Sequence, residues 1–508
     1  MDVLYSLLGV DNQRLDMIVQ EKIFTETLNF VLTTSLDDIL SIEDSMLDRF
    51  CTNILPRIDH NIKSLILESK SMERILLVTD YPNLAKLKIF NFIDKIASYY
   101  FTVGFFYLDQ SPFRRIFREQ ITDLILVYKD DIDITLERQY QNGVHDYIFK
   151  FFKNLKYLSI TGSPSIFMLG NSSLITTCSS SILSKLCVFA NGFEECFALL
   201  DGRLKQLTTF IVTINYACYD SSFVYNMDDL PNLNCFSLTC FCLTNEYDTL
   251  VLPLLRRMSN LEELTLNITN EERNTFMDGT QLNNEIIVHM PRLSKFTFHI
   301  CTKIELHHLV NYLSSDDIQR TFTNTRYQQM GCILSYTAGR AICHVFSLPY
   351  MFDRLNYIGN NFLPIVFTHV RRLTVHDKVP FQHEFFVRIA RFFPLLKVFH
   401  VLNFQSQKVV SDKRNSTDNE LFSIVEYPHL VTLSLFLSHI DYVEQFLNET
   451  KTHLPCLTTL EVNYDRLTIV TENFTRNITR LNCAKVEQLC IRTIIVHSKD
   501  VYEYFPLL

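Results

Sequence analysis

The sequence predicts an α/β fold in which one short strand-and-helix unit recurs along the chain. Three observations support this prediction: an apolar-Pro-x-Leu-x-x-Leu/Phe-x-apolar phrase that occurs six times, helical patterns between the copies, and a composition that can fill a long core. The chain has 508 residues, of which 47% are hydrophobic and 20% charged. This balance excludes wholesale disorder and fits two to four ordinary domains or one undivided repeat array.

The six copies of the phrase share the offset between a proline and a leucine. They are 81–89 (YPNLAKLKI), 230–238 (LPNLNCFSL), 290–298 (MPRLSKFTF), 393–401 (FPLLKVFHV), 427–435 (YPHLVTLSL) and 454–462 (LPCLTTLEV). Without the proline, further copies begin at Ile62, Ile121, Leu155, Leu183, Leu207, Leu261, Val370 and Val486. Successive copies are mostly 22 to 37 residues apart, and only the stretch between Leu293 and Val370 is longer.

The phrase has a physical interpretation as the entry to a strand. A short strand places its alternate Leu-x-Leu side chains on one face, and the leucine three residues earlier packs beneath them. A proline just upstream cannot continue a helix, so we expect it to end the preceding element and to force an extended entry.

Helical patterns lie between the phrases. Residues 46–55, 383–393 and 440–451 carry apolar side chains at three- and four-residue spacing. Ser438 and Asp441 are plausible starts for the last of these helices. Strand, turn and helix recurring at about 20–29 residues is the pattern of a leucine-rich-repeat solenoid.

Over about residues 60 to 495 the chain resembles irregular, intracellular leucine-rich-repeat proteins. The resemblance implies a curved parallel sheet with outer helices, in which each unit covers its neighbours. The family continues its phrase with Asn or Cys three residues past the last leucine, and only Asn191, Asn215 and Cys301 comply here. The alternative is a set of ordinary βα units in one or two α/β domains. Residues 331–348 predict a β-hairpin, either an inserted ribbon or a break in the array.

The first twenty residues resemble the second half of an F-box. Residues 2–19 carry a helical apolar stripe with a break at 9–12, and Asn12-Gln13-Arg14-Leu15 matches the family's Asn-Arg segment. The family's opening Leu-Pro-x-Glu helix is missing. The resemblance implies an adaptor-binding face formed by Leu4, Leu7, Leu8 and Leu15. The alternative is a helical cap that turns these leucines inward near Ile62 and Leu65.

These patterns predict five segments. They are a partial F-box-like segment (1–20), a helical linker or cap (21–60), leucine-rich repeats (61–320), a hairpin insertion (321–350), and further repeats with a C-terminal cap (351–508). We expect the repeats to form one continuous sheet.

The combined resemblance implies a non-catalytic protein, the substrate-recognition subunit of a cullin–RING (SCF-type) ubiquitin ligase. Such a subunit binds a Skp-type adaptor and holds a protein substrate on its concave face. Two alternatives stay open: a free-standing leucine-rich-repeat scaffold without a ligase, and an unrecognised α/β enzyme.

The sequence contains none of the common catalytic or phosphate-binding motifs. Gly-x-x-x-x-Gly-Lys, Gly-x-Gly-x-x-Gly and Gly-x-Ser-x-Gly do not occur, and glycine is scarce at 11 residues. His383-Glu384 begins like a zinc-protease helix, but Val387 occupies the position of the second histidine. We interpret His307 and His308 as a solvated pair, and His289 and His299 as surface residues. We therefore expect no catalytic, cofactor-binding or metal-binding residues.

Charge and cysteine usage restrict the partners and the compartment. The net charge is −9, so we expect no nucleic-acid surface despite the pairs at 256–257 and 371–372. The 14 cysteines include no CxxC pair, which favours reduced core thiols. Residues 1–19 do not resemble a signal peptide, and no run of 18 apolar residues suggests a membrane span. We expect a cytoplasmic or nuclear protein that has no membrane contact.

Overall fold

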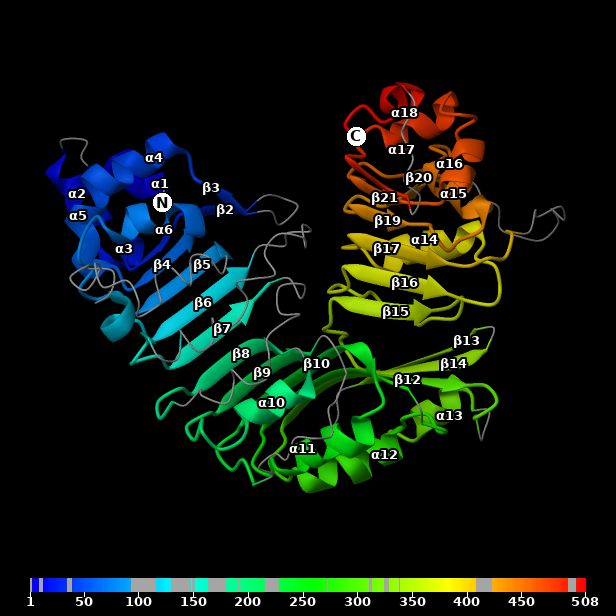
Figure 1. Cartoon of the computed structure of the whole chain (residues 1–508), viewed down its shortest axis with the longest axis horizontal. Coiled ribbons are helices and arrows are strands. Elements are labelled where there is room, and N and C mark those ends of the chain that lie inside the picture. Colours follow the sequence, from blue (N-terminus) through cyan, green and yellow to red (C-terminus); the bar gives the residue numbers. More distant parts are fainter. Residues whose placement is uncertain are drawn as a thin grey trace. The chain divides into compact units, whose positions relative to one another are not determined.

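The computed structural model describes residues 2–8, 12–33, 39–92, 116–128, 148, 151–162, 180–190, 192–214, 228–271, 273–309, 313–323, 329–337, 339–407, 423–491 and 499–508. The chain forms two compact units: unit 1 comprises 1–265 and 286–294, and unit 2 comprises 266–285 and 295–508. The boundary falls within strand β11 (Glu263–Asn270). Each unit combines helices with a mostly parallel arrangement of strands (Figure 1).

The strands of unit 1 lie side by side in chain order. They are β1 (Thr27–Asn29), β4 (Ser64–Glu68), β5 (Lys86–Phe92), β6 (Asp123–Tyr128), β7 (Tyr157–Thr161), β8 (Lys185–Ala190), β9 (Thr209–Ile214) and β10 (Cys235–Thr244). Neighbouring strands in this series pair in parallel. A separate antiparallel pair consists of β2 (Val31–Thr33) and β3 (Ile39–Ser41).

Short helical segments connect the strands of unit 1. At the N-terminal side they are α1 (Asp2–Leu7), α2 (Gln13–Val19), α3 (Lys22–Thr25), α4 (Asp44–Arg49), η1 (Phe50–Ile54), α5 (Leu55–Ile58), η2 (Asp59–Asn61) and α6 (Ser69–Leu76). Further along are η4 (Ile116–Gln120), α10 (Phe193–Leu199), η7 (Tyr247–Val251), α11 (Leu252–Arg256) and η8 (Ile287–His289). Residues 21–60, which we expected to be helical, therefore also contain three strands.

Unit 2 contains two larger groups of strands. In the first, β12 (Lys295–Glu305) pairs antiparallel with β14 (Arg340–Ser347), which pairs antiparallel with β13 (Met330–Tyr336). The second is a six-stranded parallel sheet in the order β15 (Arg354–Ile358), β16 (Arg372–His376), β17 (Val398–Leu402), β19 (Thr432–Ser434), β21 (Thr459–Glu461) and β22 (Gln488–Cys490). A short parallel pair is formed by β18 (Val425–Glu426) and β20 (Thr452–His453).

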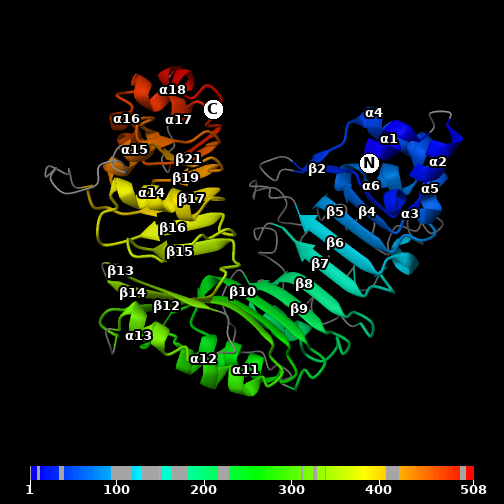
Figure 2. The same ribbon diagram turned by 180° about the vertical axis from the view of Figure 1, so that it is seen from behind.

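The helices of unit 2 are α12 (Gly279–Glu285), α13 (Ser315–Arg320), α14 (His383–Phe392), α15 (Ile440–Leu447), α16 (Tyr464–Val470), η9 (Asn477–Thr479), α17 (Arg480–Cys483) and α18 (Lys499–Tyr504). Helices α14, α15 and α16 lie along the same side of the six-stranded sheet (Figures 1 and 2). The helix expected near residue 440 begins at Ile440 and is capped by His439, whose side chain accepts from the Asp441 N–H. It starts at neither Ser438 nor Asp441, the two positions that we predicted.

Every copy of the repeated phrase forms a strand. In the six copies with proline, the strand begins four residues after the proline. The leucine N–H donates to the carbonyl of the residue before the proline, as in Leu84 to Tyr81 (3.1 Å) and Leu396 to Phe393 (3.3 Å). Proline is thus the second residue of a β-turn, where its fixed φ is favourable. The proline shapes a turn, rather than only ending the preceding element as we predicted.

A ladder of side-chain amides joins these turns in unit 1. Each amide donates to a carbonyl in the preceding turn: Asn61 to Gln20 (2.9 Å), Asn83 to His60 (2.6 Å), Gln120 to Pro82 (3.4 Å), Asn154 to Glu119 (2.7 Å), Asn232 to Lys205 (2.9 Å) and Asn260 to Pro231 (2.9 Å). These donors occupy one position, directly before the Leu or Ile that lies three residues ahead of the Leu-x-Leu pair. The ladder therefore repeats with the strands.

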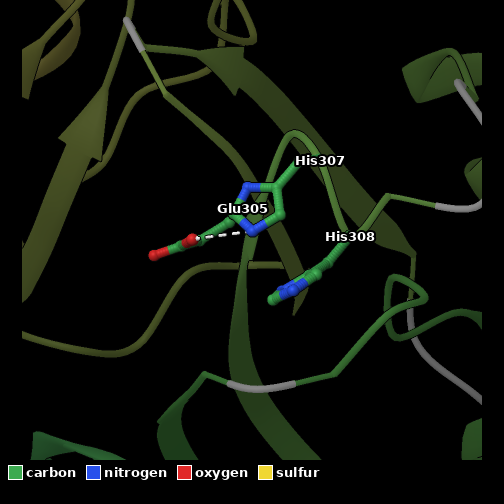
Figure 3. A group of neighbouring side chains, drawn as sticks. All are labelled: Glu305, His307 and His308. Carbon is green, nitrogen blue, oxygen red and sulfur yellow. Dashed lines mark ion pairs between the residues drawn. The ribbon is translucent and has the colours of Figure 1, made fainter.

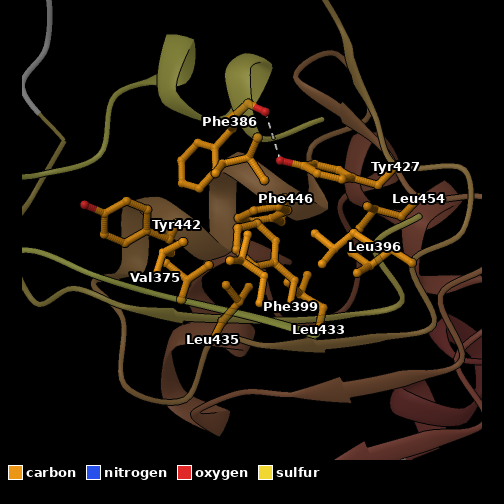
Figure 4. Packing of buried hydrophobic residues seen from close by; sticks show 14 of the residues in the cluster. Val375, Phe386, Leu396, Phe399, Tyr427, Leu433, Leu435, Tyr442, Phe446 and Leu454 are labelled. Carbon is orange, nitrogen blue, oxygen red and sulfur yellow. Dashed lines mark hydrogen bonds between the residues drawn. The ribbon is translucent and has the colours of Figure 1, made fainter. Parts of the chain in front are cut away.

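The core of the six-stranded sheet is built from the framework residues of the phrases and from aromatic side chains of α14 and α15. Phe399 and Leu433 from neighbouring strands pack against Phe386 and Phe446 from the helices, and all four are fully buried (Figure 4). The Tyr427 hydroxyl donates to the Phe386 carbonyl at 3.0 Å. A strand-and-helix unit thus buries its apolar face against its neighbours, as the pattern predicts.

The hairpin predicted at 331–348 is confirmed as β13 and β14, but the prediction of one continuous sheet is wrong. Strand β13 is the last strand of its sheet, and a separate sheet begins at β15. Two successive antiparallel pairings leave β13 running in the same direction as β12, yet among the described residues no strand pairs with the outer edge of β13. Contact continues through side chains, because Ser335 of β13 accepts from the Gly359 N–H at 3.0 Å.

Candidate functional site

The four leucines predicted to bind an adaptor lie on or directly after α1 and on α2. Leu4 and Leu8 are only 1% and 3% exposed. The side chains of Leu7 and Leu15 lie outside the described residues. Helix α1 packs on α4 and η1: the Tyr5 ring lies 6.0 Å from Phe50, and the Arg49 guanidinium lies 4.6 Å above Tyr5. Leu4 and Leu8 are therefore closed to a partner in this conformation.

Exposed apolar side chains in this region lie on α2 and α3 instead. Met17 is 67% exposed, Ile18 45%, Ile23 81% and Phe24 38%. These four residues, called the N-terminal apolar patch below, were not among our predicted adaptor contacts. All four lie within eight consecutive residues, and exposed apolar side chains that gather on one surface are a feature of protein-binding sites.

A second candidate surface is the side of the unit 1 strands that faces away from the leucine core. The strand register places Ile66, Lys88, Ile125, Ser159, Cys187, Ile211 and Ser237 in one row across seven strands. We call this the central row. Ser159 is buried, Ile211 is 37% exposed, and the remaining members are half-buried. The row combines aliphatic side chains with small polar ones.

The corresponding side of the six-stranded sheet in unit 2 has a different chemistry. Its register aligns Asn356, Thr374, His400, Ser434, Glu461 and Cys490. Burial lowers the pKa of His400, so its imidazole is neutral near pH 7. Burial and the neighbouring Arg372 lower the pKa of Arg354, which lies in the adjacent row. This face is polar, whereas three of the seven residues in the central row of unit 1 are isoleucines.

A chain of buried polar side chains crosses β11, β12 and β14 in unit 2. His299 Nδ1 lies 2.9 Å from Asn267 Oδ1, and His299 Nε2 lies 3.0 Å from His344 Nδ1. His344 Nε2 lies 4.0 Å from Cys301 Sγ. Burial lowers the pKa of His299 to about 3 and also lowers that of His344. The expectation that His299 is a surface residue is wrong, because aromatic residues including Tyr350 and Phe352 cover it.

Cys301 and His344 approach the thiol–imidazole pairing of a cysteine nucleophile, with His299 and Asn267 orienting the base. The thiolate is the reactive form, however, and burial raises the pKa of Cys301 to about 12. Cys301 is only 2% exposed and His344 only 1%. These four side chains are therefore better explained as a hydrogen-bonded network inside the core. Sequence analysis could not find it, because the pairings depend on strands far apart in sequence.

A pocket of about 270 Å³ lies in unit 1 beside the end of α10. Six of its 13 lining residues are leucines, and the largely buried Arg257 contributes to it. The Arg257 guanidinium donates to the carbonyls of Asp228 and Leu200, both at 2.8 Å. Burial lowers the pKa of Arg257. The opposing effect, which raises this pKa, comes from the nearby Cys196, Asp228, Asp229 and Asp201. We had considered this arginine as part of a basic pair; in the structure it joins two backbone segments.

His383, which resembles the start of a zinc-protease helix, is held by hydrogen-bonding partners. Its Nδ1 lies 3.2 Å from Gln445 Oε1, and its Nε2 lies 2.9 Å from the Ser423 carbonyl. Both ring nitrogens are thereby engaged in fixing α14 to its neighbours.

No protein-family model matches this chain, and a search of curated proteins gave no match either. Among the residues that the structure describes, no helix is both long enough and apolar enough to cross a membrane.

Proposed function

We propose that this chain is a non-catalytic protein-binding protein of the leucine-rich-repeat type. The observation that carries the proposal is the central row, which places one side chain from each of seven consecutive parallel strands in line, six of them at least partly accessible. A repeated unit that cannot bury its faces alone, stacked in chain order, is the basis of repeat architectures. Such architectures bind their partners on the extended surface that the stacked units leave exposed.

The composition of the central row favours a protein as the partner. Ile66, Ile125 and Ile211 supply apolar contact area, and Lys88 lies 4.4 Å above the ring of Phe90 on the same strand. Protein interfaces join an apolar centre to polar surroundings. The net charge of −9 disfavours a nucleic-acid partner.

The test is a variant that places charge in the centre of the row. Ile125→Glu with Ile211→Glu would introduce two carboxylates, whereas Val288→Glu changes a 64% exposed residue elsewhere in unit 1. Proteins captured by the full-length wild type are identified by mass spectrometry, and the strongest is purified for direct titration. We expect the double variant to bind it at least tenfold more weakly and the control to bind normally. Equal binding by all three proteins would refute the assignment of the surface.

A second proposal is that the protein acts as the substrate-recognition subunit of a cullin–RING ligase. It is supported by two short helices, α1 and α2, in the segment that resembles an F-box, and by the N-terminal apolar patch. Because Leu4 and Leu8 are buried, we place the contact with a Skp-type adaptor on Met17, Ile18, Ile23 and Phe24.

A pull-down with a purified Skp-type adaptor tests this second proposal. Met17→Asp with Ile23→Asp should abolish capture, because buried apolar anchors carry most of the affinity at such contacts. Leu40→Asp, at a position that is 50% exposed on β3, serves as the control. If the wild type captures no adaptor, the ligase association fails and the free-standing scaffold replaces it.

A further inference from the structure

Three side chains capable of binding a metal converge at the end of β12. Glu305, His307 and His308 each offer a ligand atom, and these atoms lie within 4.8 Å of one another (Figure 3). Glu305 is the last residue of β12, and both histidines lie in the turn that follows. All three residues are exposed, so an ion could reach them without unfolding of the chain.

Backbone hydrogen bonds hold this turn in place. The His308 N–H donates to the Glu305 carbonyl at 2.9 Å, and the Leu306 N–H donates to the Gly339 carbonyl at 2.9 Å. The turn is thereby fixed both internally and to the β13–β14 hairpin. We had interpreted the two histidines as a solvated pair; both are exposed, and their ring centroids lie 4.0 Å apart, at 51°.

The separation of the ligand atoms suits a small divalent ion. His307 Nε2 lies 3.4 Å from Glu305 Oε2. Bonds of about 2.0–2.2 Å to Zn²⁺ in tetrahedral geometry place neighbouring ligand atoms about 3.3–3.6 Å apart. This pair therefore already has the spacing of two zinc ligands, and rotation of the exposed His308 ring is the remaining adjustment.

The carboxylate of Glu305 is oriented by a cation on its other side. Arg340 NH2 lies 3.5 Å from Glu305 Oε1, which leaves Oε2 directed at His307. Arg340 also binds Glu271 at 3.0 Å, so its charge is shared between two carboxylates. Such partners around the ligands fix ligand orientation in established metal sites.

We propose that Glu305, His307 and His308 form a binding site for a divalent transition metal ion of the zinc class. Two imidazoles and one carboxylate are a donor set suited to Zn²⁺, while Mg²⁺ and Ca²⁺ prefer oxygen ligands alone. The fourth coordination position is open to water or to a ligand from outside the chain. The site is independent of the protein-binding surfaces proposed above.

Calorimetric titration of the chelator-treated full-length protein with Zn²⁺ tests the site. We expect one equivalent to bind, and His307→Ala with His308→Ala to weaken this binding at least tenfold. Glu305→Gln should also weaken it, since the charge is lost while the shape is kept. The matched control is His289→Ala with His369→Ala, which removes two exposed histidines elsewhere and should leave the affinity unchanged.

Absorption of the Co²⁺-loaded protein provides a second measurement, because the chain also has 14 cysteines. Imidazole and carboxylate ligands give visible ligand-field bands without the near-ultraviolet charge-transfer band of a Co²⁺–thiolate bond. The proposal is overturned if the wild type binds no Zn²⁺, if the site variants bind like the wild type, if the control loses affinity equally, or if the Co²⁺ spectrum shows thiolate ligation.

Discussion

Lowering the pH should destabilise unit 2 through the buried pair His299 and His344. Burial lowers the pKa of His299 from 6.5 to about 3 and lowers the pKa of His344 as well. In the unfolded chain both imidazoles take up a proton near pH 6.5. Below that pH the unfolded state binds more protons than the folded state, so the free energy of unfolding falls as the pH falls. The stabilisation is fully present above pH 6.5 and is lost progressively towards pH 3.

The magnitude follows from the difference between the two states. In the unfolded chain, pH 5 lies about 1.5 units below the pKa of the imidazole, so the imidazole is protonated. Folded His299 stays neutral at this pH. Each pH unit below the pKa of the unfolded imidazole lowers the free energy of unfolding by about 1.4 kcal/mol. Protonation of this histidine in the unfolded state should therefore lower the free energy of unfolding by about 2 kcal/mol between pH 7 and pH 5. His344, whose pKa burial also lowers, adds to this loss in the same direction. The loss of about 2 kcal/mol from His299 alone is already large beside typical domain stabilities of about 5–15 kcal/mol.

Urea unfolding at several pH values between 7 and 5 measures this loss. Other groups also contribute: hydrogen bonds from Arg476 and Asn448 outweigh the opposing effect of burial and lower the pKa of Glu444. The comparison that isolates the histidine is therefore wild type against His299→Asn. Asparagine cannot be protonated in this range, so the pH-dependent loss should shrink by about 2 kcal/mol even where the variant is less stable throughout.

His369→Asn, which changes an exposed histidine, is the matched control and should leave the pH dependence unchanged. The reasoning is refuted if the stability of His299→Asn falls with pH as steeply as that of the wild type. An equal change in the slope for both variants would also refute it, because the effect would then not depend on burial.

Three further substitutions test the framework, each by urea unfolding. Leu433→Ala should lower the free energy of unfolding by about 2–5 kcal/mol through lost burial and a cavity. Leu437→Ala, at a residue that is 39% exposed in the same repeat, should change it by no more than about 0.5 kcal/mol. A loss below about 1 kcal/mol for Leu433→Ala would mean that the framework is misassigned. Arg257→Met should cost about 2–3 kcal/mol, because two carbonyls lose a charged donor, while exposed Arg256→Met should have little effect. Asn232→Ala should cost about 1 kcal/mol if the amide ladder stabilises the turns, and no measurable change would show that it does not.

The strands could be predicted because their signal is local. A strand of the type Leu-x-Leu is specified by alternation over a few residues, and its start by a turn that lies directly before it. Both parts fall within nine residues, as in 427–435, where Pro428 lies in the turn and Leu433 and Leu435 are fully buried. The amide ladder had a signal as well, since an Asn or Gln directly before the Leu or Ile that precedes the Leu-x-Leu pair, as in 82–84 and 231–233, recurs in unit 1.

Features that depend on distant pairings could not be predicted. Asn267, His299 and His344 stand on three different strands, and nothing in the local sequence of any of them indicates that they meet. The same applies to α1, whose apolar stripe fits an exposed face as well as a buried one. Burial of Leu4 and Leu8 depends on the position of η1, some forty residues later in the chain.

The unusual polar groups of unit 2 have a common physical origin in the break between the repeats. Within the repeats, one carbonyl before each strand accepts the first two N–H groups of the next repeat: the carbonyl of Ala85 accepts from Thr122 and Asp123, and the carbonyl of Arg371 accepts from Lys397 and Val398. This backbone pattern runs from Glu26 to Ser294 and begins again at Asp353.

Between those points the described residues show no such pair of backbone bonds, and side chains take their place. The Ser347 hydroxyl accepts from the Phe298 N–H at 3.0 Å, and the Ser335 hydroxyl accepts from the Gly359 N–H at 3.0 Å. A buried N–H that lacks a partner costs about 1–3 kcal/mol, so polar side chains at a break in the array are favoured energetically. The buried His299–His344 pair and the Glu305 turn lie on the same strands, β12 and β14, and on the turn that follows β12. Buried polar residues therefore concentrate where the repeat stops, and the proposed metal site lies there too.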